Sequence, residues 1–449
     1  MLIPTGPTPT ELIPTGPAPT EPAEAVLTPA DHQLLLDLLR LPTAGPLESG
    51  DHSARLAEAQ LRYADAAAEL GFAVLRHGPP QRHWVEAPEV PLPVRTAAAA
   101  DPEFLARQPS LLLRLGGPAP RERTVMFNVH LDTVAGVQPV GHHPGPDGGR
   151  FTGRGAVDAK GPAVALLAGL RAAQAERPGL AERIRVLVQA VAGEEGGALG
   201  TFGTRPLVAA GHYGRLNVFC EPTGNRALPR STAAMTARIR VAGEDAVDDR
   251  PAAGHNATVL LGFLAQHLAA AVDPGAGQLC VAGLHTGRLH NRVYGRGELL
   301  LNLAYPDAAT AERLATAVPT ALADGLRAFA ERFADVPLLA RTAADAERIT
   351  RLDWLKRGLP ALTPDGSTGE WLARLLATAG VPAWPADQPA FTCDAIWLAD
   401  RPGTATVVLG PGTLDGNHAH AEGEFVTAAE LARFARTVAD LLAAFDADP

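Results

Sequence analysis

The chain has 449 residues, of which 46% are hydrophobic and 20% charged, and its formal net charge is -10 at pH 7. At roughly 100 to 200 residues per domain, this length predicts two or three folded units. The negative charge and the absence of a basic run argue against a nucleic-acid partner bound through its phosphates.

The N-terminal segment contains a near-perfect repeat, LIPTGPTPTE followed by LIPTGPAPTE. Its prolines lack a backbone donor and its glycines add freedom, so residues 1–27 are predicted to form a disordered tail. Binding to an adaptor protein is an alternative role for the repeat, and we prefer a solvated extension.

Apolar patterning from Thr28 onward predicts alternating helices and strands. Helices are expected around 34–39, 55–70 and 163–175, and short apolar strands at 111–115, 124–129 and 184–192. This order predicts an α/β fold with a mostly parallel central sheet.

The pattern changes near Ser231 to that of a smaller α+β unit. The expected elements are strands at 235–241, 278–284 and 298–305 and helices at 256–271 and 310–333. A helix at 367–380, a strand at 405–410 and a helix from Thr427 then return to the first pattern. We therefore predict one domain from residues 28–229 and 352–449, with residues 230–351 inserted into it.

The three cysteines are widely separated and form no CxxC pair. Neither a disulfide framework nor a thiolate zinc site is expected, which favours a cytoplasmic setting. The N-terminus lacks the pattern of a signal peptide, and no stretch reaches the roughly 18 to 20 apolar residues that cross a bilayer. We therefore predict a soluble protein with no membrane partner.

His130 and Asp132 lie two residues apart in NVHLDTV, at the end of a predicted strand. Side chains two apart on a strand point the same way, so both can reach one site. Imidazole binds zinc well, and a nearby carboxylate can fix the ring tautomer. A single histidine on a strand is more often structural, so the interpretation depends on the motifs that follow.

Asp158 lies in FTGRGAVDAKG, after a glycine-rich turn and before a predicted helix. An exposed carboxylate in that place can bridge two cations, and its alternative role is to cap the helix. The turn lacks the third glycine of a dinucleotide-binding fingerprint.

Further acidic and histidine side chains follow predicted strands. Glu194 and Glu195 are adjacent in VAGEEGG, where one can bind a metal while the other handles a proton. Glu221 follows another strand in VFCEPTG, and His420 lies near the C-terminus. Loops that carry such groups at strand ends are frequent sites of function.

In this order, the elements HLD, GRGAVDAKG, AGEEGG, CEPTG and AHAEGE resemble the successive signature motifs of one family. It comprises the acetylornithine deacetylases, succinyl-diaminopimelate desuccinylases and glutamate carboxypeptidases, which are di-zinc metallopeptidases and amidohydrolases. The resemblance covers about residues 28 to 445. It implies a zinc-peptidase-like catalytic domain with an inserted α+β lid and dimerisation domain.

The resemblance also implies roles for individual residues. The implied metal-binding side chains are His130, Asp158, Glu195, Glu221 and His420. Asp158 would bridge two divalent ions, most simply Zn²⁺, although Co²⁺ and Mn²⁺ accept the same ligands. Asp132 would orient His130, Glu194 would act as general base, and the peptide bond after Asp158 is expected to be cis.

The implied activity is hydrolysis of an amide bond in an N-acyl amino acid or a related small molecule, by metal-activated water. No GxSxG motif or recognisable cysteine nucleophile supports covalent catalysis. Asn291 and Arg292 in LHNRVYG match a substrate-binding element of the family. The expected assembly is a homodimer through the inserted domain.

Three positions depart from the family pattern. Val247 stands where the lid carries a histidine that stabilises the oxyanion, and His255 lies nearby at a variable position. Ala304 and Ile396 replace arginines, which removes bidentate clamps for dicarboxylate substrates. Two alternatives therefore remain: a repurposed enzyme that forms amides or transfers acyl groups, and a non-catalytic metal-binding or ligand-binding homologue. The presence of Glu194 disfavours the second.

Overall fold

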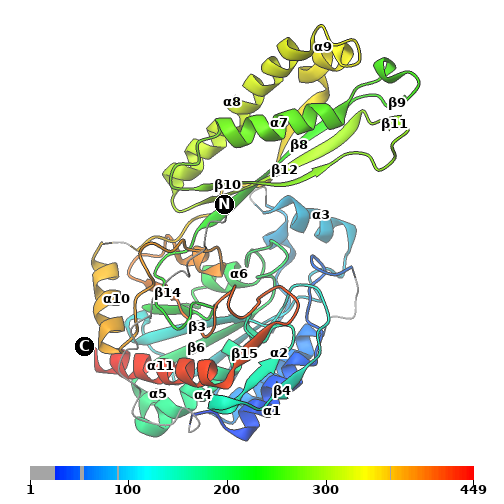
Figure 1. Cartoon of the computed structure of the whole chain (residues 1–449). Coiled ribbons are helices and arrows are strands. Elements are labelled where there is room, and N and C mark those ends of the chain that lie inside the picture. Colours follow the sequence, from blue (N-terminus) through cyan, green and yellow to red (C-terminus); the bar gives the residue numbers. More distant parts are fainter. Residues whose placement is uncertain (1–25, 51–54, 88–89, 365, 449) are drawn as a thin grey trace, which may run out of the picture.

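The computed structural model describes residues 26–50, 55–87, 90–364 and 366–448, which form two lobes (Figure 1). The predicted repeat tail lies outside these residues except at its last two positions. There, Val26 and Leu27 pack against the first core, so the folded part begins before Thr28. Within the described residues, no helix combines the length and apolarity needed to span a membrane.

A six-stranded sheet forms the centre of the first lobe. Its strands, in spatial order, are β1 (Ala73–Gly78), β2 (Ser110–Leu115), β6 (Arg185–Val191), β3 (Thr124–His130), β7 (Leu216–Phe219) and β14 (Ala405–Val408). Strands β6, β3, β7 and β14 are parallel, whereas β2 runs antiparallel to both β1 and β6. The predicted mostly parallel α/β sheet is confirmed.

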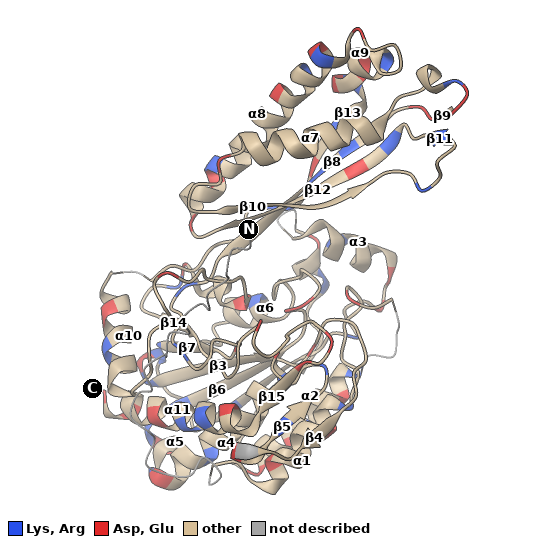
Figure 2. Ribbon diagram, viewed as in Figure 1, with Lys and Arg blue, Asp and Glu red and all other residues tan. Residues whose placement is uncertain are grey.

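Helices cover both faces of this sheet, which explains its continuous apolar strands. Phe127 faces the larger core, whereas Met126 belongs to a smaller cluster on the other face. The larger core is built by α1 (Pro29–Leu39), α2 (Leu56–Ala68), α4 (Lys160–Glu176), α10 (Gly366–Thr378) and α11 (Ala428–Ala447). The smaller cluster includes Val208 of α6 (Thr204–Ala209). Strands β3 and β7 carry no Lys, Arg, Asp or Glu (Figure 2).

Shorter elements complete the first lobe. They are α3 (Leu92–Ala100), α5 (Leu180–Arg183), and the small antiparallel sheet of β4 (Gly141–His143), β5 (Arg150–Thr152) and β15 (Phe425–Thr427). Thr427 caps α11 and forms a capping box with Glu430. This cap explains why the last predicted helix begins where it does.

The second lobe, residues 233–356, is built on a separate antiparallel sheet. Its strands, in spatial order, are β10 (Gln278–His285), β12 (Arg296–Tyr305), β8 (Ala233–Ala242) and β13 (Thr350–Lys356). Its helices are α7 (Ala257–Ala271), α8 (Ala308–Phe333) and α9 (Ala340–Ile349). Along β8, Met235 and Ala237 face the helices, while Thr236 lies on the other face of the pleat.

Strand β13 changes the predicted boundary at residue 351. It pairs with β8 as far as Lys356, so residues 352–356 belong to the second sheet rather than to the first lobe. The predicted boundary lies too early in the chain, because the segment RLDWLK contains no turn residue that would mark where the strand ends. The chain leaves the sheet only after this edge strand is complete.

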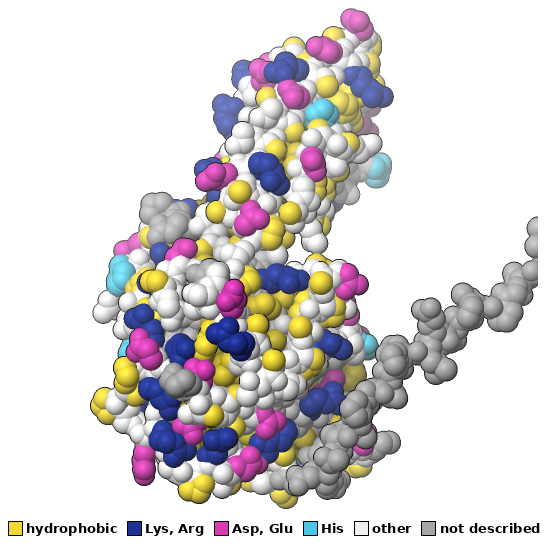
Figure 3. All heavy atoms as spheres, turned by 90° about the vertical axis from the view of Figure 1, so that its left-hand side faces the viewer, with side chains coloured by type: hydrophobic (Ala, Val, Ile, Leu, Met, Phe, Trp, Pro, Cys, Tyr) yellow, Lys and Arg dark blue, Asp and Glu magenta, His cyan; other side chains and the backbone are white. Residues whose placement is uncertain are grey.

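Apolar side chains join the two lobes. Leu199, Leu359 and Ile396 come from the first lobe or its connection, yet they lie in the same buried cluster as Met235 of β8. This contact sets the near end of the second sheet against the loops that follow the central strands. On the molecular face shown in Figure 3, positive and negative side chains are interspersed.

Two helical glycines provide a test of the packing. A Cβ atom at Gly169 of α4 would lie 2.5 Å from the Ala435 carbonyl oxygen of α11, whereas one at Gly262 of α7 would meet nothing within 4 Å. Gly169→Ala is expected to lower the free energy of unfolding by about 1–3 kcal/mol through overpacking. Gly262→Ala should leave it unchanged or raise it by about 0.5–1 kcal/mol, because alanine favours helix.

The free energy of unfolding of both variants is measured by urea denaturation, with circular dichroism as the signal. Equal stability of Gly169→Ala and the wild type would contradict the close contact between α4 and α11.

Candidate metal centre

The predicted ligands converge at one edge of the central sheet. His130 is the last residue of β3, Glu194 and Glu195 follow β6, and Glu221 follows β7. These three strands are parallel and adjacent, so their carboxyl ends meet at the same edge. Ligand sites of open α/β sheets form at such an edge.

Asp158, just before α4, lies between two imidazoles. Its Oδ1 is 2.8 Å from Nε2 of His130, and its Oδ2 is 3.0 Å from Nε2 of His420. The same His420 nitrogen is 3.0 Å from Oε1 of Glu195, and Nε2 of His130 is 3.7 Å from Oε2 of Glu221. One carboxylate therefore links two groups of side chains.

These side chains form two possible metal sites that share Asp158. One comprises His130, Asp158 and Glu221, and the other Asp158, Glu195 and His420, with the ligand atoms of each within 4.8 Å of one another. Mixed imidazole and carboxylate sets suit zinc and related divalent cations. Because each oxygen of Asp158 faces a different group, the donor set fits a pair of cations.

Charge is concentrated in this centre. Burial alone would lower the pKa of His130. The Glu221 and Asp158 carboxylates outweigh burial and raise this pKa well above its usual value. Burial alone would raise the pKa of Asp158. Hydrogen bonds from His130 and His420 outweigh burial and hold this pKa well below its usual value. Hydrogen bonds to Asp158 and Glu195 raise the pKa of His420 to about 10. Imidazole and carboxylate groups of opposite charge therefore stabilise each other in this centre.

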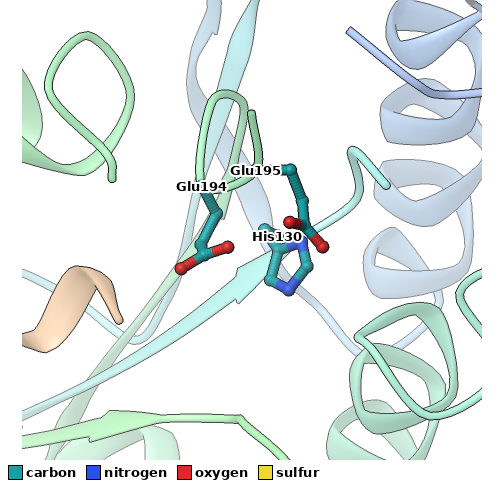
Figure 4. Close-up of side chains that lie close together, drawn as sticks. All are labelled: His130, Glu194 and Glu195. Atoms are coloured by element: carbon teal, nitrogen blue, oxygen red, sulfur yellow. The ribbon is translucent and has the colours of Figure 1, made fainter. Parts of the chain in front are cut away.

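Glu194 differs from its neighbour Glu195. The two carboxylates leave the same loop in different directions around the His130 ring (Figure 4). Burial, together with the nearby Glu195 and Glu221 carboxylates, raises the pKa of Glu194 well above its usual value. Burial also raises the pKa of Glu195, to about 7.

Asp132 orients His130 through its main chain and not, as expected, through its carboxylate. His130 Nδ1 donates to the main-chain carbonyl of Asp132 at 2.9 Å, whereas the Asp132 carboxylate is 3.9 Å from that nitrogen. Its Oδ2 instead accepts the backbone N–H groups of Gly193 at 3.0 Å and Glu195 at 3.1 Å. The main chain of Asp132 fixes the imidazole, and its side chain fixes the loop that carries both glutamates.

Glu424 holds the loop before Asp158. Its Oε1 accepts the backbone N–H groups of Gly155 at 3.0 Å and Val157 at 3.2 Å, and its Oε2 pairs with Arg154 at 2.6 Å. No structural role was expected for Glu424, although the AHAEGE motif contains this residue. The peptide bond between Asp158 and Ala159 is cis, as expected.

The structure does not bring Asn291 and Arg292 to the metal centre of the same chain. Arg292 begins β11 (Arg292–Val293), which pairs with β9 (Ala246–Val247) at the far end of the second lobe (Figure 1). Val247 is therefore distant as well. His255 is buried there: its Nδ1 accepts the Glu244 N–H at 2.9 Å, and its Nε2 is 3.0 Å from Asp345. It does not substitute for the absent lid histidine.

The other two departures from the family pattern lie in different surroundings. Ile396 is completely buried in the second core. Ala304 lines a cavity of about 250 Å³ together with Tyr305 and Gln278. Arg230 also lines this cavity, so a cationic residue lies beside Ala304.

Solved structures with this fold span nearly the whole chain. A tripeptidase from Staphylococcus aureus is 14% identical, with a TM-score of 0.66 over 93% of this chain and 98% of that one. Human carnosine dipeptidase 1 is 15% identical, with a TM-score of 0.61 over 93% and 97% of the two chains. A Bacillus subtilis protein described as a dinuclear metal binding peptidase from family M20 is 13% identical, with a TM-score of 0.55 over 92% and 96%.

Comparison with curated proteins found no match. The sequence profile of Peptidase family M20/M25/M40, however, matches residues 126–444, which is more than half of the chain and includes all five predicted ligands. The protein therefore belongs to peptidase family M20/M25/M40.

Proposed function

We propose that this protein is a zinc-dependent hydrolase that cleaves the amide bond of an N-acyl amino acid or a related small molecule. The observation that carries the proposal is Asp158, whose two oxygens each face a different group of potential ligands. Membership of the family supports a hydrolytic metallopeptidase-type activity. The names of the similar tripeptidase and dipeptidase point to small substrates for those proteins, in keeping with this proposal.

In the proposed site, Asp158 would be a ligand of two cations. His130 and Glu221 complete one set of ligands, and Glu195 and His420 complete the other. Zn²⁺ is our first choice, and Co²⁺ or Mn²⁺ accepts the same ligands. When bound, two such cations acidify a water molecule and polarise an amide carbonyl.

Glu194 is the proposed general base. It could form a third group of ligands with His130 and Glu195, but it belongs to neither of the two sets that share Asp158. It would accept a proton from the attacking water and return it to the amine nitrogen that leaves. A raised carboxylate pKa suits this exchange near neutral pH. A thiol nucleophile is disfavoured at Cys220 and Cys393, because burial raises the pKa of both.

We also propose a homodimer through the second lobe. Asn291 and Arg292 lie far from the metal centre of their own chain, so contact with substrate requires another copy of the protein (Figure 1).

All three cysteines are free. This agrees with the cytoplasmic location that we propose.

A second candidate is a repurposed enzyme that forms amides or transfers acyl groups. It is favoured by Val247, whose side chain cannot donate a hydrogen bond to an oxyanion and is 56% exposed in the single chain. A third, non-catalytic reading is disfavoured because metal binding alone would not need Glu194.

The bridging role of Asp158 predicts a loss of metal on substitution. Asp158→Ala should reduce bound zinc well below two equivalents, because both ligand groups lose a shared oxygen donor. Asp415→Ala is the matched control, since Asp415 is exposed in the loop that precedes His420. Metal content is measured by plasma mass spectrometry after dialysis. Two equivalents retained by Asp158→Ala would remove the bridge from the proposal.

The adjacent glutamates predict opposite phenotypes. Glu194→Gln should retain metal and lower kcat by about 100-fold or more, because an amide cannot accept the water proton. Glu195→Gln should lose metal from the site that it shares with His420. Both variants are assayed for metal content and for turnover of N-acetyl amino acids and dipeptides. Full turnover by Glu194→Gln would exclude it as general base.

Val247 separates a hydrolase from a repurposed enzyme. In a hydrolytic dimer, Val247→His should raise kcat for an N-acetyl amino acid about ten-fold or more, because a missing oxyanion donor costs about 2.7–4 kcal/mol. Light scattering establishes the dimer first, and metal content is checked in both proteins. A monomer would contradict the proposed assembly. No gain in kcat, together with product formation from free acid and amine, would favour the second candidate.

A further inference from the structure

Another cavity, of about 360 Å³, lies in the first lobe beside the loop that carries Asp158. Its wall comes mainly from residues 39–44 and 133–140, and none of the predicted metal ligands lines it. No described lining residue is acidic, whereas three are cationic: Arg40, Arg154 and Lys160. The cavity is therefore separate from the metal centre and opposite to it in charge.

Lys160 brings a buried positive charge to this cavity. It is the first residue of α4 and is 1% exposed, and its Nζ donates to the Leu41 carbonyl oxygen at 2.9 Å. The Glu424 and Asp132 carboxylates attract this ammonium, but among the described residues neither forms an ion pair with it. An ammonium has three N–H donors, so two remain for another partner.

Two further donors of the lining residues are unpaired. Thr43 is 1% exposed, and its Oγ1 has no hydrogen-bond partner within the described part of the chain. Arg154 pairs with Glu424 through Nη1 at 2.6 Å, but its buried Nε meets no acceptor there either. An unpaired buried polar group costs about 1–3 kcal/mol. Donors left in this state beside a cavity indicate a ligand with acceptor atoms.

Backbone contacts place the threonine and the lysine on neighbouring segments. Ala44, which follows Thr43, forms a β-bridge with Thr133. A Cβ atom added at Gly155 would lie 3.0 Å from Cγ2 of Thr133 and 2.8 Å from Cδ of Lys160. The stem of the lysine therefore passes beside the segment to which residues 43 and 44 are joined.

Arg154 borders the same cavity from the loop before α4. A Cβ atom added at Gly136 would lie 3.4 Å from its Nη2 and 3.9 Å from its Nε, so the guanidinium lies against the 133–140 segment. Arg40 is exposed and pairs with Asp37 at 2.9 Å, so it adds positive charge on the solvent side. Cationic groups thus border both the inner and the outer part of the cavity.

We propose that this cavity binds a tetrahedral oxyanion, held by the Lys160 ammonium, the Arg154 Nε–H and the Thr43 hydroxyl. One centre with several oxygen acceptors can satisfy donors that come from three different segments, and hydrogen bonds from cations to such oxygens are strong. The anion is either free or the phosphate group of a small ester. It would tie the segment after α1 to the loop that carries Asp158, without being a ligand of either cation.

The first test locates the ligand. Crystals of the zinc-loaded protein are soaked in selenate, a tetrahedral oxyanion, and diffraction data are collected on both sides of the selenium absorption edge, where the zinc signal hardly changes. The difference should show a peak beside Thr43, Arg154 and Lys160. Selenium only at the metal centre or on the outer surface, or no peak at all, would overturn the assignment.

The second test measures affinity by calorimetry of the zinc-loaded protein with selenate. Thr43→Val should raise the Kd about three- to ten-fold, because one hydrogen bond to the anion is lost. Without the anion, the same variant should be at least as stable in urea as the wild type, because an unpaired buried hydroxyl has been removed. An unchanged Kd would contradict the proposed role of the hydroxyl.

Thr342→Val is the matched control. Thr342 is buried in the second lobe, and its Oγ1 accepts the N–H of Asn256 at 2.8 Å, so this variant should lose stability but keep the wild-type Kd. Equal weakening in both variants would show a general effect on folding and would overturn the assignment. Methyl phosphate is titrated in parallel: tighter binding than selenate, with the same loss in Thr43→Val, would identify an ester as the ligand, and weaker binding a free oxyanion.

Discussion

The contact of Asp158 with two imidazoles is the constraint on which the rest of the site depends. His130 comes from the end of β3 and His420 from a loop near the C-terminus, more than 280 residues apart in the chain, yet each faces one oxygen of the same carboxylate. Asp158 reaches this position because the glycine-rich loop before it is held by Glu424 and α4 begins directly after it. The parallel strands then add the three glutamates at the same edge.

Such a concentration of buried carboxylates is unfavourable without positive charge, because desolvation and like-charge repulsion both oppose ionisation. Burial is the largest influence on the pKa of Glu194 and of Glu221, and it raises both. Divalent cations in the two ligand groups would relieve this cost.

Much of the fold could be predicted from apolar periodicity. The strands β3 and β6 are continuous apolar runs because both faces of the sheet are covered, and α4 appears as an alanine-rich and leucine-rich segment because it is almost entirely buried. Strand β1 gave no such signal, since its residues are exposed or only half-buried. The end of the second lobe was misplaced because β13 is an amphipathic edge strand without a turn signal.

The candidate ligands were predictable because each follows a strand or a glycine-rich turn within a short motif. Contacts made by main-chain atoms were not: the Asp132 carbonyl, rather than its carboxylate, holds His130. The short motifs predicted which side chains could bind metal. The contacts that hold these side chains in place could be identified only from the structure.

The proposed role of Asp158 is to join two cation sites. It is tested most directly by anomalous diffraction from crystals of the zinc-loaded protein, with data collected on both sides of the zinc absorption edge. Two anomalous peaks are expected about 3.5–4 Å apart. One should lie beside His130 and Glu221 and the other beside Glu195 and His420, each next to an oxygen of Asp158. A single peak under saturating zinc, or two peaks that Asp158 does not join, would contradict it.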